Sequence, residues 1–181
     1  MQEDIAQVLV DAAAIQKKVK EMGAAISRDY AGKDLLVVGI LRGAIIFLAD
    51  LVREITIPLQ LDFMAVSSYG TGTSTSGAVR ILKDLEVPVE DKHLLIVEDI
   101  IDTGLTLKYL LENLQARQPL SVRACTILDK PERRLVDVHV DYSGFAIPDY
   151  FVVGYGLDYA QQYRHLPAIC VLKPEVYSRK K

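Results

Sequence analysis

The residues of this chain best suited to chemistry lie in the stretch LLIVEDIIDTGLTLKYLL, which begins at Leu94. An apolar, strand-like run ends there in two carboxylates, Glu98 and Asp99, and a third, Asp102, follows before a predicted helix. Three carboxylates within five residues repel one another, which is costly without a cation or a polyhydroxylated ligand. Their oxygens could hold a hard cation such as Mg2+ or accept hydrogen bonds from sugar hydroxyls.

Thr103, Gly104 and Thr106 come next, at the predicted amino terminus of that helix. Backbone N–H groups are unpaired there, and the helix dipole favours an anion. A glycine admits close approach of a ligand and two hydroxyls add donors, so the turn would suit a phosphate. The simpler interpretation is that Asp102 or Thr103 only caps the helix. The stretch is not a P-loop, because it contains no G-x-x-x-x-G-K-[ST].

Apolar periodicity along the chain predicts alternating strands and helices. Such an order indicates an α/β domain with a mainly parallel twisted sheet flanked by helices. Ligands bind such sheets beyond the carboxyl ends of the strands, which is where the carboxylates fall. The expected strands are 8–10, 35–41, 61–67, 79–82, 94–97, 122–128 and 150–153. The expected helices are 12–30, 44–54 and 106–117. Asp11 would cap the first helix, and the second is apolar around most of its girth and is therefore expected to be buried.

Composition narrows the class of protein. A chain of 181 residues is one domain of ordinary size. A net charge of -3 argues against nucleic acid as the main partner, since a phosphate backbone recruits a basic face. Cys125 and Cys170 lie in apolar runs and are expected to be reduced core thiols. With no signal peptide or membrane span evident, we expect a cytoplasmic protein without a membrane partner.

At residues 97–104, VEDIIDTG, the chain resembles the phosphoribosyl-pyrophosphate (PRPP) pattern of type I phosphoribosyltransferases, in the form of the hypoxanthine-guanine branch. Four further blocks follow the family's order: residues 41–44, Ser68–Tyr69 with the Ser/Thr/Gly run behind it, Lys130, and residues 147–164. The resemblance implies the type I phosphoribosyltransferase fold, with a small hood formed by the chain termini. It further implies a single domain over residues 1–181, with a lid at about 67–80 and a hood that includes about 147–181.

The resemblance also implies a reaction: with Mg2+, PRPP and hypoxanthine or guanine give IMP or GMP and pyrophosphate, as in purine salvage. Glu98 and Asp99 match the pair that holds the ribose hydroxyls and magnesium. Asp102 also contacts PRPP and matches a general base or acid facing purine N7. Thr103, Gly104 and Thr106 match the cradle of the 5-phosphate.

Other positions are assigned in the same way. Arg42, Gly43 and Arg164 match the pyrophosphate site, and the peptide between Leu41 and Arg42 is predicted to be cis. The residues that match the purine site are Lys130, Phe151, Val152 and Asp158, the last also at a second magnesium; Ser68 and Tyr69 match the lid. Five of these residues have a plainer interpretation without the resemblance. Lys130 could be a solvated loop lysine, Phe151 and Val152 ordinary strand core, and Asp158 and Arg164 surface charges.

Two other hypotheses remain open at this point. The first is a PRPP-responsive regulator on the same fold that binds RNA or DNA, since fold alone does not decide function. The second is an enzyme for xanthine, adenine or a pyrimidine, although Lys130 near O6 disfavours adenine, whose amino group would meet it donor against donor. The family forms dimers and tetramers, so we expect a homo-oligomer.

Overall fold

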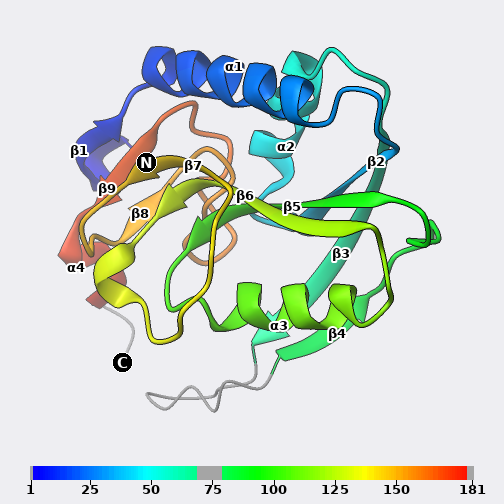
Figure 1. The fold of residues 1–181 in the computed structure, drawn as a ribbon. Helices are drawn as coiled ribbons and strands as arrows, with labels where there is room; N and C mark the ends of the chain where they lie inside the picture. The colour runs from blue at the N-terminus through cyan, green and yellow to red at the C-terminus, as the bar shows by residue number, and fades with distance from the viewer. Residues whose placement is uncertain (1, 69–78, 179–181) are drawn as a thin grey trace.

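The computed structural model describes residues 2–68 and 79–178, which form two sheets and the helices around them (Figure 1). The larger sheet has the strand order β4-β3-β2-β5-β6-β7 and the smaller one β1-β9-β8. In chain order the elements are η1 (Gln2–Asp4), β1 (Ile5–Val10), α1 (Ala12–Asp29), β2 (Leu35–Leu41), α2 (Ile45–Glu54), β3 (Gln60–Ser68), β4 (Val79–Lys83), β5 (His93–Ile101), α3 (Leu105–Gln115), β6 (Ser121–Asp129), η2 (Pro131–Arg133), β7 (Tyr142–Ala146), β8 (Val152–Val153), β9 (Ile169–Leu172) and α4 (Pro174–Ser178).

The six-stranded sheet is parallel except at one edge. β2 pairs with β3 and β5, β5 with β6, and β6 with β7, all in parallel, whereas β4 runs antiparallel to β3. Helices α1 and α2 cover one face of the sheet and α3 the other (Figure 1). The predicted α/β fold with a mainly parallel sheet flanked by helices is therefore confirmed.

Side chains of the central strands alternate between two cores, because successive residues of a strand point to opposite faces. Val37, Leu95 and Val97 pack in the core under α1 and α2. Leu36 and Leu94 pack in the core against α3. Burial on both faces explains why β2 and β5 read as continuous apolar runs instead of alternating ones.

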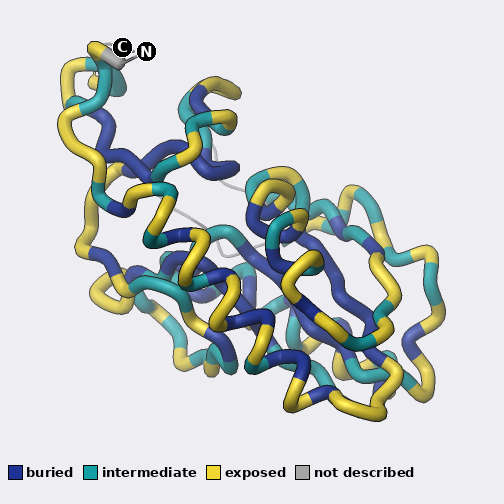
Figure 2. The backbone as a smooth tube through the Cα atoms, turned by 90° about the horizontal axis from the view of Figure 1, so that it is seen from above, coloured by how far each residue is buried: buried dark blue, intermediate teal, exposed yellow. Residues whose placement is uncertain are grey.

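Helix α1 forms as its sequence predicts. Asp11 accepts a hydrogen bond from the backbone N of Ala14 at 2.8 Å and so caps the first turn. Seen from above, buried and exposed stretches follow one another within every turn of α1, as expected for a helix with one face against the core (Figure 2). Its buried apolar side chains are spaced three or four residues apart: Ile15, Val19, Met22 and Ile26.

The two ends of the chain meet in the smaller sheet. β1 pairs antiparallel with β9, from Ile5 opposite Leu172 to Val10 opposite Ile169. The short β8 adds to the other side of β9. A hood made from the chain termini was predicted from the resemblance and is confirmed. The expected lid residues 69–78, Tyr69 among them, lie outside the described part of the chain.

Several predicted boundaries were wrong. β5 continues past residue 97 to Ile101, because Glu98 and Ile100 stay in register with β6. The expected strand 150–153 shrinks to its last two residues. Two strands were not predicted: β7 contains a serine and a glycine, which weaken a strand pattern, and β9 has only four residues.

Helix α2 is less buried than its composition suggested. Phe47, Leu48 and Leu51 are buried, but Ile45 and Ile46 remain 38% and 37% exposed. The helix therefore leaves an apolar strip on the surface. No helix in the described ranges has both the length and the apolar character needed to cross a membrane.

Candidate functional site

The carboxylate pair at the end of β5 lies in an unfavourable electrostatic environment. Glu98 is 8% exposed, and burial together with the charge of Asp99 raises its pKa well above the ordinary value. Burial also raises the pKa of Asp99, to about 6, although the backbone N of Ile100 donates to its Oδ1 at 2.8 Å. No ion pair with a described residue reaches either carboxylate. A bound cation, or hydroxyl groups that donate hydrogen bonds, would stabilise the two negative charges.

The loop after β2 lies directly against the carboxylates. A Cβ on Gly43 would come within 1.7 Å of Asp99 Oδ2, so this position can hold only glycine without a rearrangement. The preceding peptide, between Leu41 and Arg42, is cis as predicted. Gly156, which has a φ of +100°, brings the hood equally close, because a Cβ there would lie 2.1 Å from the Gly43 carbonyl oxygen. The loop is thus enclosed between the β5 carboxylates and the hood.

A small cavity of about 90 Å³ lies where β5 turns into α3. Gly104 is the N-cap of α3 with a φ of +85° and has no side chain with which to cap the helix. Asp102 therefore does not serve as a helix cap, and Thr103 Oγ1 makes only a long contact of 3.4 Å with the backbone N of Leu105. The free helix terminus faces a cavity lined by Glu98, Ile100, Ile101, Asp102, Thr103, Gly104, Thr106 and Leu107.

Asp102 and Lys130 belong to one chain of charges. Arg133 Nε donates to Asp102 Oδ1 at 2.6 Å, and its Nη1 donates to Asp149 Oδ2 at 3.1 Å. These two carboxylates, Asp102 first, raise the pKa of the Arg133 guanidinium. Lys130 Nζ donates to Asp149 Oδ1 at 3.3 Å and to the carbonyl oxygen of Tyr150 at 2.6 Å. Lys130 is only 7% exposed, so the interpretation as a solvated loop lysine was wrong.

The predicted pyrophosphate residues meet through a glutamine. Gln161 Oε1 accepts from Arg42 Nη1 at 3.0 Å and from Arg164 Nη2 at 3.2 Å. Arg164 also pairs with Asp158 at 2.8 Å, and Asp158 Oδ2 accepts from the backbone N of Gln161. Two cations thus converge on one exposed acceptor, as an anion site would require.

Asp158 does not join the other carboxylates in a compact metal site. Among the described residues, no three His, Cys, Asp or Glu side chains converge closely enough to hold a metal ion. A magnesium ion beside Glu98 and Asp99 would need further oxygen ligands from substrate or water, which is the usual coordination of that ion. The pair, in which Glu98 is buried, Asp99 is half-buried and neither has an ion-pair partner among the described residues, fits such an ion.

Phe151 immediately precedes β8 and Val152 is the first residue of that strand, and the two lie in different environments. Phe151 is 41% exposed, so its interpretation as ordinary strand core was wrong, whereas Val152 is 7% exposed and packs in the core under α1. Ser68 is the last residue of β3. Tyr69, the second lid residue, lies outside the described residues.

Sequence reasoning missed three residues that hold the site together: Arg133, Asp149 and Gln161. The charged run KPERR after β6 could have drawn attention to Arg133. No local signal indicates that Asp149 or Gln161 meets partners from other elements.

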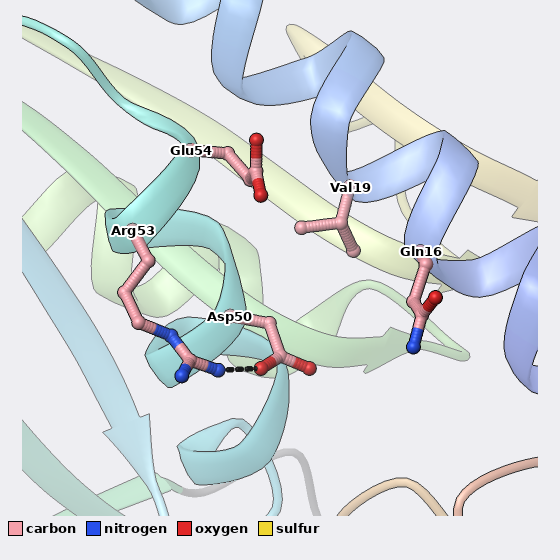
Figure 3. A pocket seen from close by; sticks show the side chains of 5 residues that line it. All are labelled: Gln16, Val19, Asp50, Arg53 and Glu54. Atoms are coloured by element: carbon pink, nitrogen blue, oxygen red, sulfur yellow. Dashed lines mark hydrogen bonds and ion pairs between the residues drawn. The ribbon is translucent and has the colours of Figure 1, made fainter.

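A second cavity, of about 320 Å³, opens between α1 and α2 (Figure 3). Its lining contains none of the predicted site residues. Asp50 and Arg53 of α2 pair with each other there, and Tyr155 Oη donates to Asp50 at 2.7 Å. We assign no function to this cavity, whose lining is Gln16, Val19, Asp50, Arg53 and Glu54.

The model of the phosphoribosyl transferase domain matches residues 7–160 of this chain. The chain belongs to the phosphoribosyl transferase family. The family match takes in the β5–α3 segment, Lys130 and Asp158, and it ends before Arg164.

Individual members of the phosphoribosyl transferase family are similar to this chain over nearly its whole length. The hypoxanthine-guanine phosphoribosyltransferase of Bacillus subtilis is 52% identical over 177 residues, 98% of each chain. That of Streptococcus mutans is 48% identical over 179 residues, 99% of each chain. The crystal structure of a hypoxanthine phosphoribosyltransferase from Staphylococcus aureus matches with a TM-score of 0.95 at 51% identity, covering 98% of this chain and 96% of that one. The resemblance inferred from VEDIIDTG is confirmed.

Proposed function

We propose that this chain is a purine-salvage enzyme that transfers the 5-phosphoribosyl group from PRPP to hypoxanthine or guanine. The bond from ribose C1 to pyrophosphate breaks, a bond from C1 to the purine forms, and the products are IMP or GMP and pyrophosphate. One observation carries the proposal: a carboxylate pair with Glu98 buried and Asp99 half-buried, a helix-terminus cavity and a buried lysine meet where β5 and β6 end. Full-length relatives that bear the name of this activity support it.

The phosphoribosyl half of the proposed site is the β5–α3 segment. Thr103, Gly104 and Thr106 bind the 5-phosphate, because the free N–H groups of α3 and two hydroxyls line the cavity there. Glu98 and Asp99 accept hydrogen bonds from the ribose hydroxyls.

The pyrophosphate and the magnesium ion lie beside these groups in our proposal. Arg42, the backbone at Gly43, and Arg164 hold the leaving pyrophosphate. Glu98 and Asp99 would hold Mg2+, with Asp158 near a second ion, and the bound metal would supply positive charge against the negative charge of the pyrophosphate. Ser68 and Tyr69 belong to a lid that excludes water from the ribosyl centre.

The purine lies between β5 and the hood. Lys130 donates to the 6-oxo group, which suits an ammonium whose present acceptors are a carbonyl and a carboxylate. Phe151 stacks on the ring, the backbone of Val152 contacts its edge, and Asp158 lies beside the base. Asp102 accepts or returns the proton at N7 as general base or acid, while Arg133 fixes one of its oxygens.

One assay tests the proposal. The purified protein is incubated with PRPP and Mg2+ and with hypoxanthine, guanine, xanthine or adenine in turn, and the nucleotide formed is measured. We expect IMP and GMP, little product from adenine, and loss of product when EDTA removes the metal. Salt-dependent binding of RNA or DNA without turnover of any base would instead favour the regulator hypothesis.

The proposed function also bears on the partners, the cellular location and the oligomeric state of the protein. We expect no nucleic-acid or membrane partner and a cytoplasmic enzyme, which cell fractionation tests. We also expect a homodimer or homotetramer, because Ile45 and Ile46 leave apolar surface on α2. Light scattering after size exclusion measures the assembly.

A further inference from the structure

The ring of Phe151 contacts two tyrosine rings that follow it in the chain, Tyr159 and Tyr177. Tyr177 of α4 stacks on it, with ring centroids 4.8 Å apart and planes inclined by 23°. Tyr159 stands almost perpendicular, at 5.7 Å and 86°. Phe151 still exposes 41% of its surface. Tyr177 therefore covers one face of the ring, while the residue as a whole keeps enough exposed surface to contact a flat ligand.

The ring of Tyr177, which covers Phe151, belongs to the hood. Tyr177 and Tyr159 pack against the small core of the hood, whose buried members are Val153, Tyr163, Cys170 and Leu172. Phe151 is bound to the same unit through its backbone, since its carbonyl oxygen accepts from the backbone N of Leu172 at 3.0 Å. The ring thus projects from the hood with its support behind it.

Both ends of the chain fix the position of α4. Immediately before that helix, the backbone N of Lys173 donates to the carbonyl oxygen of Asp4 at 2.9 Å. Lys173 Nζ donates to the carbonyl oxygen of Glu3 at 2.6 Å. These contacts to η1 anchor the start of α4, which in turn places Tyr177 on Phe151.

We propose that Tyr177 is a positioning residue that holds Phe151 as a platform for the purine, so that Tyr177, Phe151 and the base form a continuous stack. This role rests on the proposed function, because it requires the base to bind on Phe151. An exposed, unsupported phenylalanine would have to be ordered when the base binds, and that ordering weakens binding. Stacking by Tyr177 provides the order beforehand.

The proposal predicts a selective effect on the base. In Tyr177→Leu, apolar volume is kept in the hood but the ring is lost, so the KM for guanine at saturating PRPP should rise about 2- to 10-fold, the range for one aromatic pair. The KM for PRPP and kcat should change less than about 2-fold, since Tyr177 contacts neither the phosphate cavity nor Asp102 in this structure. Tyr177→Phe should restore the wild-type KM for guanine, because it keeps the ring and removes only the hydroxyl.

Two further variants separate stacking from general loosening of the hood. Val176→Ala removes apolar contact between the same helix and the hood core but leaves the stacked pair of rings intact, so it should leave the KM for guanine unchanged. In a Phe151→Ala background, Tyr177→Leu should have no additional effect. Thermal denaturation of each variant shows that the hood is folded.

Each other result overturns a defined part of the reasoning. An unchanged KM for guanine in Tyr177→Leu, or an equal rise in Val176→Ala, removes Tyr177 from this role. A lower KM in Tyr177→Leu means that the tyrosine occupies the base's own face of Phe151, which also contradicts the proposal. A wild-type protein that forms no nucleotide from any base refutes the proposed function instead.

Discussion

Asp99→Asn should make the ligand-free protein more stable while impairing its use of PRPP. Burial raises the pKa of Asp99 from 3.8 to about 6, so the folded state disfavours the charge that this side chain carries at pH 7. A shift of about two units corresponds to about 3 kcal/mol. Asparagine removes the charge and keeps an oxygen for the backbone N of Ile100. Since Asp99 is only partly shielded from solvent, and the amide also loses hydration, we expect a gain of about 1–3 kcal/mol.

The gain should depend on pH in a defined direction. The folded protein binds a proton at Asp99 more readily than the unfolded chain, so the unfavourable contribution is complete above about pH 6 and disappears below about pH 4. Urea or thermal unfolding in EDTA at several pH values measures it; at pH 7 the midpoint should rise by about 3–10 °C. Added Mg2+ and PRPP should stabilise the wild type more than the variant, because ligands stabilise the state that binds them.

Asp62→Asn is the matched control. Burial alone would raise the pKa of Asp62, but backbone N–H donors from Val87, Phe63 and Glu86 outweigh it and lower the pKa. Oδ2 accepts two of these bonds, at 2.7 and 2.8 Å, and an amide NH2 at that position would meet donors. This variant should lose about 1–3 kcal/mol at pH 7. If Asp99→Asn loses stability as well, or its gain persists undiminished at pH 4, the electrostatic argument is wrong.

Three further variants test the proposed catalytic and purine residues. Asp102→Asn should lower kcat on the order of 10²-fold with little change in PRPP binding by calorimetry; unchanged turnover would remove it as general base or acid. Lys130→Ala should raise the KM for guanine about 10- to 100-fold, because a buried charged donor is lost. Arg133→Gln should lower kcat/KM for guanine by less than about 10-fold, because its ion pair is exposed, and the difference from wild type should shrink in 1 M NaCl.

What could be predicted from the sequence was local in the chain. The β5–α3 segment carries its strand, its turn glycine and its helix in consecutive residues, so apolar periodicity and Gly104 were enough to predict the arrangement. The Asp11 cap on α1 was predictable for the same reason. The length of β5 was not, since Glu98 and Asp99 look like loop residues, and only pairing with β6 keeps them in the strand.

What could not be predicted depends on partners far apart in sequence. The contact of Arg133 with Asp102 requires η2 to fold back beside the end of β5. Gln161 joins Arg42 to Arg164 only because the hood lies against the loop after β2. Similarly, Lys130 could be recognised as buried only once Tyr150 and Asp149 were seen beside it. Periodicity reports which face of an element is apolar, and it carries no information about such pairings.

The pairing of β1 with β9 has a consequence for synthesis on the ribosome. β1 must wait for β9, which is synthesised much later, before this edge of β1 is paired, since Ile5 lies opposite Leu172. Joining segments so distant along the chain costs loop-closure entropy and is slow compared with local contacts. β5 and α3, with β2 and β6, can associate earlier in translation. A nascent chain should therefore form its β5–α3 turn before its hood, which is completed only when β9 and α4 have emerged.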